Sequence, residues 1–431
     1  MEFNSEQREA IEHKNGPLLI IAGAGTGKTR VITSRILHLI NSGQAKPEEL
    51  LALTFTEKAA NEMVERIDEQ MPLGYEQLCI KTFHAFCDQV LRESGLEIGL
   101  DPGYKILSQV DEWFFFKKHL FDFSLEYYRP VGNPNRFIYA ILNHFSSLKD
   151  ELIEHEKYAK YAEGLEGEEK EKTLELVKVY QEYEELKLRH NVLSFGDLCY
   201  YCTKLFKKRS SVLEKYQKSF KHILVDEFQD TNFAQFSLLL QLVSGEKNLT
   251  VVGDDDQSIY KWRGASLSNI LQFNEYFPKA KSVVLTENYR SAAKILDASY
   301  KLISNNNPDR LETKMGISKK LKCNIAGDDN VEVHHFPDFL GESSFVAKKI
   351  EELVATGVRY RDIAILVRAN GHAYPFIEEM KAKSIPFQVK NPKGLLSLSE
   401  VKDLLSIVRV VSNPYDDVSL LRVLKMPVFN I

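Results

Sequence analysis

An apolar run that leads directly into a glycine-rich turn and a Lys-Thr pair constrains the fold of this chain more than any other stretch. Residues 18–31 read LLIIAGAGTGKTRV, so the run enters a turn and Gly27-Lys28-Thr29 opens a helix. Glycine tolerates positive φ, and the N–H groups of such a turn can surround phosphate oxygens at a helix N-terminus. Lys28 adds a positive charge, and the Thr29 hydroxyl suits Mg²⁺. The stretch predicts a strand, a phosphate-binding loop and a helix.

The residues expected around the phosphates are Ala22, Gly23, Ala24, Gly25, Thr26, Gly27, Lys28 and Thr29. Ala22 stands where the strict motif has Gly, a change small enough to leave the turn intact. A glycine-rich turn with only a structural role is the alternative. The agreement of apolar run, glycines, Lys and Thr favours the nucleotide site.

A second short apolar run, at 222–225, ends in the acidic sequence DEFQDT at 226–231. Ligands of open α/β sheets bind beyond the carboxyl ends of the strands, so we expect this sequence to meet the phosphate loop. Asp226 is then the candidate Mg²⁺ ligand, directly or through water, and Glu227 the general base for an attacking water. An exposed acidic loop is the alternative, which the presence of the phosphate loop disfavours.

A third apolar run, at 249–252, leads into a sequence that makes a family resemblance plain. The chain resembles superfamily 1 DNA helicases of the UvrD, Rep and PcrA group, whose signatures occur here in order. They are GTGKT at 25–29, TFTEKAANEM at 54–63, TFH at 82–84, DEFQDT at 226–231, GDDDQSIYKWRGA at 253–265 and TENYRS at 286–291. The resemblance implies an α/β fold: a RecA-like P-loop NTPase lobe with an inserted all-helical domain, followed by part of a second RecA-like lobe.

The resemblance also implies an ATP-dependent 3′-to-5′ DNA helicase, with ATP and Mg²⁺ as cofactors. By this likeness Gln7 recognises adenine through its amide, and Arg30 and Tyr289 hold the ring between them. Arg290 is expected to reach the γ-phosphate as an arginine finger does, and Gln257 to bond the γ-phosphate or the attacking water. The expected catalytic residues are Lys28, Glu227, Gln257 and Arg290.

Single-stranded DNA contacts are implied by the same motifs. Phe55, Tyr260 and Trp262 are expected to stack on bases. Stacking does not depend on which base is present, and so it suits a motor that moves along DNA of any sequence. Thr82, His84 and Arg368 are expected to meet the DNA backbone, and Arg263 is a further expected DNA contact. Considered without the resemblance, Phe55 is a core residue and His84 a satisfied polar one. Glu57 stands where the family usually has Asn, which affects local DNA contacts and leaves the ATP chemistry untouched.

Charge and hydropathy limit the partners of the chain. With a net charge of −5, the chain as a whole is not strongly basic. Single-stranded and duplex DNA are therefore expected to bind in a localised basic groove. No apolar run approaches the ~18 residues that span a bilayer, and the N-terminus is unlike a signal peptide. We therefore expect a cytoplasmic protein with no membrane partner, and repair or replication proteins as further candidate partners.

Five cysteines are too few and too scattered for a disulfide framework. Cys199 and Cys202 form a CxxC, which is a redox pair, half a zinc site or helical core packing. The apolar, helix-like surroundings and the lack of a second CxxC favour core packing.

A chain of 431 residues is too long for one core. We expect long helices from about 106 to 190, whose aromatic run at 113–116 is core and whose Glu- and Lys-rich stretch is a solvated face. Strands are expected at 331–335 and 363–367. The expected division is a first ATPase lobe at 1–105 and 191–283, a helical insertion at 106–190, part of a second lobe at 284–392 and the start of a helical accessory domain at 393–431.

Two late motifs of the family, a second γ-phosphate arginine and a segment that joins ATP to DNA, have no counterpart in the sequence. The chain is therefore expected to be an N-terminal portion of a helicase that binds nucleotide but is weak or inactive as a motor. The alternative is a nucleotide-dependent module that binds single-stranded DNA or a protein partner without productive hydrolysis. A GTPase or transporter ATPase is disfavoured, because the sequence has neither an NKxD nor an LSGGQ-like motif.

Overall fold

The computed structural model describes residues 2–71, 78–243, 248–259, 267–327, 330–390, 399–412, 414 and 417–426. The chain divides into two compact units, Met1–Val331 and Glu332–Ile431. Within the described ranges, no helix combines the length and the apolar character needed to cross a membrane.

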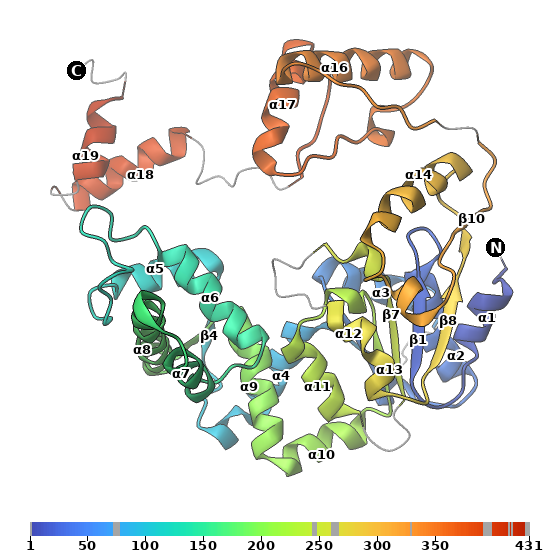
Figure 1. Cartoon of the computed structure of the whole chain (residues 1–431), viewed down its shortest axis with the longest axis horizontal. Helices are drawn as coiled ribbons and strands as arrows, with labels where there is room; N and C mark the ends of the chain where they lie inside the picture. Colours follow the sequence, from blue (N-terminus) through green and yellow to red (C-terminus); the bar gives the residue numbers. More distant parts are fainter. Residues whose placement is uncertain are drawn as a thin grey trace. The chain divides into compact units, whose positions relative to one another are not determined.

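A six-stranded sheet forms the centre of the first unit, and all of its strand pairs are parallel (Figure 1). In spatial order the strands are β3 (Cys79–Thr82), β2 (Leu50–Thr54), β6 (His222–Val225), β7 (Leu249–Gly253), β1 (Leu18–Ala22) and β8 (Lys281–Leu285). Every residue of β1, β6 and β7 is buried, as expected for a parallel sheet covered on both faces. The α/β fold class and these three predicted strands are confirmed.

Helices cover both faces of the sheet, because successive strand residues point to opposite sides. Leu18 and Ile20 of β1 belong to one hydrophobic core, and Leu19 and Ile21 belong to the other. The first core includes residues of α1 (Ser5–Ile11), α2 (Lys28–Asn41) and α3 (Glu57–Asp68). The second includes residues of α4 (Phe83–Ser94), α9 (Phe195–Lys208), α10 (Ser210–Ser219), α11 (Phe233–Leu242), α12 (Leu267–Leu271) and α13 (Phe273–Tyr276).

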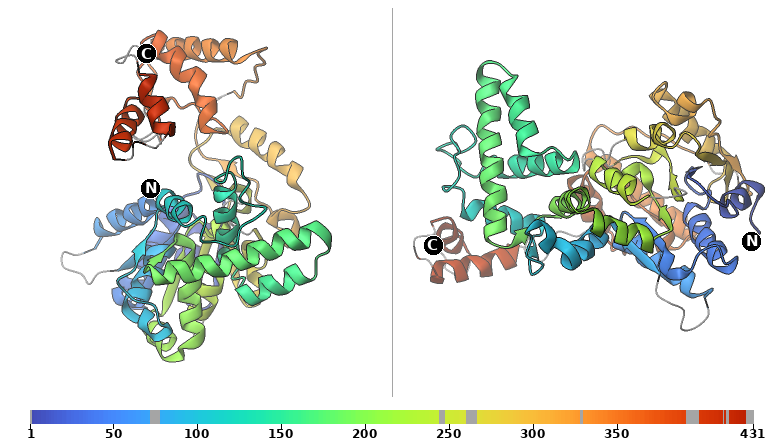
Figure 2. Two further views of the ribbon diagram at one scale, coloured as in Figure 1. Left: turned by 90° about the vertical axis from the view of Figure 1, so that its left-hand side faces the viewer. Right: turned by 90° about the horizontal axis from the view of Figure 1, so that it is seen from below.

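The segment between α4 and α9 is helical, as predicted. Its helices are α5 (Gln109–Lys118), α6 (Ile138–Asp150), α7 (His155–Glu163) and α8 (Gly167–Arg189), flanked by the paired short strands β4 (Lys105–Ile106) and β5 (Val192–Leu193). α7 and α8 lie side by side (Figure 2). Phe116 is buried in the core of this segment, whereas Phe114 is 50% exposed. The predicted core role of the aromatic run therefore holds for Phe116.

A buried ionic cluster joins the helical segment to α9. Lys149 on α6 and Lys187 on α8 lie 3.2 and 2.5 Å from the carboxylate of Asp197, and all three side chains are buried. Lys187 is thus an exception to the predicted solvated face of the Glu- and Lys-rich stretch. The ion pair with Asp197 offsets the free-energy cost of burying its charge. One turn along α9, Cys199 and Cys202 are buried free thiols, which confirms core packing.

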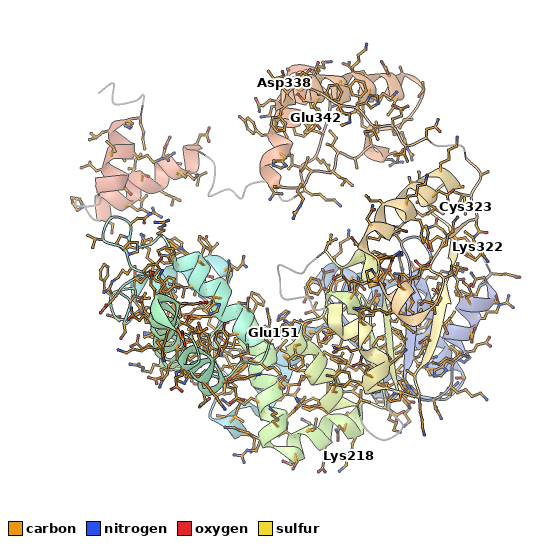
Figure 3. All side chains as sticks on the ribbon, viewed as in Figure 1. Glu151, Lys218, Lys322, Cys323, Asp338 and Glu342 are labelled. Atoms are coloured by element: carbon orange, nitrogen blue, oxygen red, sulfur yellow. The ribbon has the colours of Figure 1, made fainter. Side chains whose placement is uncertain are left out.

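A smaller layer follows β8 in the same unit. β9 (Glu287–Asn288) pairs in parallel with β10 (Lys322–Cys323), and between them lie α14 (Ala293–Ile303) and α15 (Leu311–Met315). Figure 3 labels Lys322 and Cys323 on β10.

The second unit is helical. α16 (Phe339–Ala355) packs on α17 (Tyr374–Ala382), and α18 (Ser399–Ser412) is joined to α19 (Asp417–Leu424) by an ion pair between Asp403 and Arg422. The strands predicted at 331–335 and 363–367 are wrong, since neither segment pairs with a strand in the described structure. Ile363 and Ile365 still pack on the helical core, while Leu366 is 93% exposed. The alternation at 331–335 and the continuous apolar run at 363–367 both predict an extended backbone, but a strand also needs a neighbouring backbone to bond.

Candidate nucleotide-binding site

The predicted phosphate loop lies between β1 and α2. Gly25 and Gly27 have φ of 77° and 88°, values that side chains disfavour, so the loop requires glycine at both positions. Thr26 is buried and donates its hydroxyl to Gly23 O at 2.8 Å, which closes the loop. Gly27 is the N-cap of α2. The first N–H groups of a helix have no partner within it, and the positive end of the helix dipole lies at the same terminus. The loop therefore has the geometry of an anion site.

The three predicted adenine contacts gather at this loop. Gln7 Nε2 donates to Thr26 O at 3.0 Å, and Tyr289 N donates to Gly25 O at 3.0 Å. The guanidinium of Arg30 lies 4.4 Å from the ring of Phe3. Asn4 Nδ2 donates to the Tyr289 hydroxyl at 3.1 Å, so the N-terminal segment links these side chains. Their role toward adenine stays a prediction.

Lys28, Glu227 and Gln257 meet in one hydrogen-bonded group, although they come from three separate strand ends. Lys28 Nζ donates to Glu227 Oε2 at 2.9 Å and to Gln257 Oε1 at 3.0 Å. Gln257 Nε2 in turn donates to Asp254 Oδ2 at 2.7 Å. The strand order places β6, β7 and β1 side by side, which brings their carboxyl-terminal loops together.

The backbone of Glu227 is in the left-handed region, with φ 50° and ψ 44°. This conformation is uncommon for a residue with a side chain and costs about 1–3 kcal/mol. Two hydrogen bonds hold it: Glu227 N donates to Asp226 Oδ1 at 2.9 Å, and Gln229 Nε2 donates to Glu227 Oε2 at 2.8 Å. Gln229 Oε1 also accepts from Asp254 N at 3.0 Å, and so ties the loops after β6 and β7 together.

Asp226 and Thr29 fit the requirements of Mg²⁺. Asp226 follows β6 directly and is only 3% exposed. Burial and the neighbouring charge of Glu227 raise the pKa of the Asp226 carboxyl to about 7. A cation beside this carboxylate would oppose both effects, and Mg²⁺ prefers oxygen donors of these kinds.

Arg290 lies next to the phosphate loop. A Cβ on Gly25 would come within 2.7 Å of Arg290 Cβ and 2.6 Å of Asn288 Nδ2. Asn288 was not singled out as a site residue, yet its side chain donates to Ala24 O at 2.6 Å and accepts from the N–H groups of Arg290 and Ser291. An Asn that precedes a turn is a recognisable signal for such bonds.

Two family descriptions match this chain. "UvrD/REP helicase N-terminal domain" matches residues 3–278, and "UvrD-like helicase C-terminal domain" matches residues 283–431. The chain belongs to the UvrD/REP helicase family.

Among individual relatives, this UvrD/REP chain is similar to proteins named ATP-dependent DNA helicase PcrA. It is 38% identical to that of Bacillus subtilis (strain 168) over 432 residues, which cover 99% of this chain and 55% of the relative. It is 37% identical to that of Staphylococcus epidermidis (strain ATCC 12228 / FDA PCI 1200), covering 99% and 56%. For Staphylococcus aureus (strain NCTC 8325 / PS 47) the identity is 36%, again over 99% and 56%. The chain thus spans a little over half the length of these relatives.

Three of the DNA contacts expected of a UvrD/REP protein lie at one edge of the sheet. Thr82 ends β3 and is in register with Thr54, the residue before Phe55, and His84 lies in the first turn of α4. Thr82 Oγ1 donates to Glu57 Oε1 at 2.9 Å and accepts from Ala85 N at 3.2 Å. Burial lowers the pKa of His84, whose ring lies 5.8 Å from that of Phe195. Glu57, the departure from the family pattern, therefore engages the hydroxyl expected to meet DNA.

The other predicted DNA contacts lie elsewhere. Tyr260, Trp262 and Arg263 fall outside the described residues. Arg368 belongs to the second unit, where it is exposed. The DNA-binding role of all four residues stays a prediction.

Proposed function

We propose that this chain binds ATP at the loop of residues 22–29 and hydrolyses it with Glu227 as general base. The observation that carries the proposal is the meeting of Lys28, Glu227 and Gln257 beside a glycine loop at a helix N-terminus. A helix N-terminus, together with a lysine ammonium and a carboxylate that lie 2.9 Å apart, supplies the groups that phosphoryl transfer to water needs.

The geometry supports a sequence of events for one turnover. Phosphate oxygens would compete with Glu227 and Gln257 for Lys28 Nζ. They carry more charge than the neutral Gln257 amide, and ATP would offer several of them against the single Glu227 carboxylate. Once Lys28 bonds a phosphate, the Glu227 carboxylate loses one of the two side-chain donors to Oε2, keeps the bond from Gln229 Nε2, and can take a proton from the attacking water. The water oxygen bonds to the γ-phosphorus, the bond to the bridging oxygen breaks, and ADP leaves with that electron pair.

Arg290 and Gln257 would make contacts that ATP offers and ADP lacks. Arg290 is adjacent to the loop through Gly25, and Gln257 already bonds Lys28. Mg²⁺, held by Thr29 and Asp226, would neutralise phosphate charge. Only such differential contacts can favour one conformation over another, so they are the means by which ATP would drive movement.

We further propose that hydrolysis drives movement along single-stranded DNA and the unwinding of duplex DNA. Membership of the UvrD/REP family and the PcrA helicases among its relatives support this step. The 3′-to-5′ polarity, a cytoplasmic location and partners in repair or replication are part of the proposal. So is the division into a first lobe (1–105 and 191–283), a helical insertion (106–190), part of a second lobe (284–392) and an accessory segment (393–431).

The experiment is steady-state ATP hydrolysis by this chain with and without a single-stranded oligonucleotide, at low and moderate salt. From the motor proposal we expect hydrolysis that requires Mg²⁺ and increases with DNA, and strong stimulation would make the expectation of a weak or inactive motor wrong. If nucleotide and DNA bind separately but DNA does not stimulate hydrolysis, the chain acts as a nucleotide-dependent binding module, and the motor proposal is wrong for it.

A further inference from the structure

Three consecutive carboxylates, Asp254, Asp255 and Asp256, surround the ammonium group of Lys319. Their oxygens lie within 4.8 Å of one another. Lys319 Nζ is 2.5 Å from Asp254 Oδ1 and 2.8 Å from Asp256 Oδ2, and it also contacts Asp255. Lys319 is 7% exposed, and although burial opposes its charge, Asp254 and Asp255 raise its pKa. The protein itself therefore supplies the cation that these carboxylates require.

A second cation, Arg310, closes the cluster from the same segment. Its Nε and Nη2 atoms donate to the two oxygens of Asp256 at 2.8 and 2.7 Å, the bidentate geometry of a strong pair. Leu311 N donates to Asp255 Oδ2 at 2.7 Å. Each of the three carboxylates after β7 is thus held by groups from residues 310–319.

The cluster is connected to the nucleotide site through Asp254. One oxygen of Asp254 accepts from Lys319, and the other accepts from Gln257 Nε2 at 2.7 Å. The opposite end of the same amide accepts from Lys28 Nζ at 3.0 Å. Four side chains therefore form an unbroken path from Lys319 to the phosphate-loop lysine, and they fix which end of the Gln257 amide faces Lys28.

The segment around Lys319 touches the phosphate loop as well. A Cβ on Gly23 would come within 3.0 Å of Leu321 Cδ2. β10, which follows directly and carries Lys322 and Cys323 (Figure 3), pairs with β9. β9 carries Asn288, which bonds Ala24 O. Residues 319–323 therefore bridge the loop after β1 and the loop after β7.

We propose that Lys319 and Arg310 are positioning residues that orient the Gln257 amide toward the γ-phosphate of ATP. Loss of Lys319 would leave adjacent carboxylates uncompensated, so Asp254 would turn from Gln257 or take up a proton. Gln257 would then lose the acceptor that fixes its amide. The effect on nucleotides rests on the proposed function, whereas the effect on the amide does not.

The first test observes the amide directly. In the full chain with ¹⁵N-labelled glutamine, the side-chain signal of Gln257 is identified by its loss in Gln257→Ala. We expect Lys319→Gln to shift or broaden this signal, and the matched control Lys320→Gln, whose exposed ion pair with Asp297 spans 3.5 Å, to leave it unchanged. An unchanged signal in folded Lys319→Gln overturns the proposal. If that variant does not fold, Arg310→Lys, which keeps the charge but loses the bidentate pair, is held to the same criterion.

The second test uses a non-hydrolysable ATP analogue and ADP in binding titrations. We expect Lys319→Gln to weaken the analogue about five- to tenfold, the worth of one hydrogen bond, and ADP less than twofold. In a Gln257→Ala background the same change should cost nothing further. If Lys319→Gln still weakens binding of the analogue in the Gln257→Ala background, Lys319 does not act through Gln257 and the proposal is overturned. If Gln257→Ala itself leaves the preference for the analogue unchanged while the amide signal responds to Lys319, the γ-phosphate role in the proposed function is wrong and the positioning role holds.

Discussion

At the scale of single residues, Glu227 combines a backbone in the left-handed region with a direct hydrogen bond to the phosphate-loop lysine. Its carboxylate accepts from Lys28 and Gln229, and both contacts tolerate an amide oxygen. Glu227→Gln should therefore keep the fold and ATP affinity but lower hydrolysis by about 10²–10⁴, the usual contribution of a general base. Single-turnover hydrolysis and nucleotide titration check this. Glu65→Gln, at an exposed position on α3, is the control. Equal turnover in Glu227→Gln would remove Glu227 as the base.

Asp150 gives a second residue-scale prediction, concerning pH. Burial and the charge of Glu151 raise its pKa from 3.8 to about 7, while Asn232 Nδ2 donates to it at 2.7 Å. The folded protein then binds more protons than the unfolded chain between these values, so this group makes stability fall as pH rises from about 4 to 7. Each pKa unit corresponds to about 1.4 kcal/mol.

Asp150→Asn should remove that dependence. Its melting temperature should match the parent protein near pH 4 and exceed it at pH 8, because an amide oxygen can still accept from Asn232. Asp309→Asn, on an exposed loop, should change neither value. A variant that is less stable than the parent at pH 8 would show that the Asp150 charge is favourable in the fold.

At the scale of elements, the ionic cluster of Lys149, Lys187 and Asp197 joins α6, α8 and α9. Asp197 also accepts from Ser194 N and Oγ, and despite its burial the two lysines lower its pKa. Asp197→Ala would leave two buried lysines with one fewer partner, which should cost about 3–5 kcal/mol of the free energy of unfolding. Glu185→Ala, which removes an exposed ion pair with Arg189 and an exposed hydrogen bond from Gln181, should cost under about 1 kcal/mol. Denaturant unfolding distinguishes the two, and equal losses would contradict the role of the cluster.

The elements also show where sequence reasoning succeeds. The strands at 18–22, 222–225 and 249–252 were predictable because each is apolar on both faces and ends in a motif. The segment 363–367 has the same composition, but its strand state depends on a neighbouring backbone that local sequence does not specify. Lys319 and Arg310 escaped notice for a related reason. Their aspartate partners after β7 are more than fifty residues away, and an isolated Lys or Arg in a polar segment looks like an ordinary surface residue.

At the scale of the whole molecule, the proposed DNA binding would have to occur against a net charge of −5. General attraction to the protein is therefore weak, and affinity depends on a few phosphate contacts and on stacked bases. The two kinds of contact respond differently to salt, because only a phosphate contact releases counterions from the strand. In our proposal, Arg368 is a phosphate contact and Trp262 a stacking contact.

Arg368→Ala should therefore reduce the slope of log affinity against log salt by about 0.7, the share of one phosphate on a single strand. Trp262→Ala should lower affinity by about 1–3 kcal/mol at every salt concentration, for any base sequence, and leave the slope unchanged. Fluorescence titrations of a labelled oligonucleotide between low and moderate salt measure both quantities. Arg359→Ala, which removes an exposed arginine paired with Asp362 in the same unit, should alter neither. If Trp262→Ala changes the slope, or Arg368→Ala leaves it intact, the assignment of base and backbone contacts is wrong.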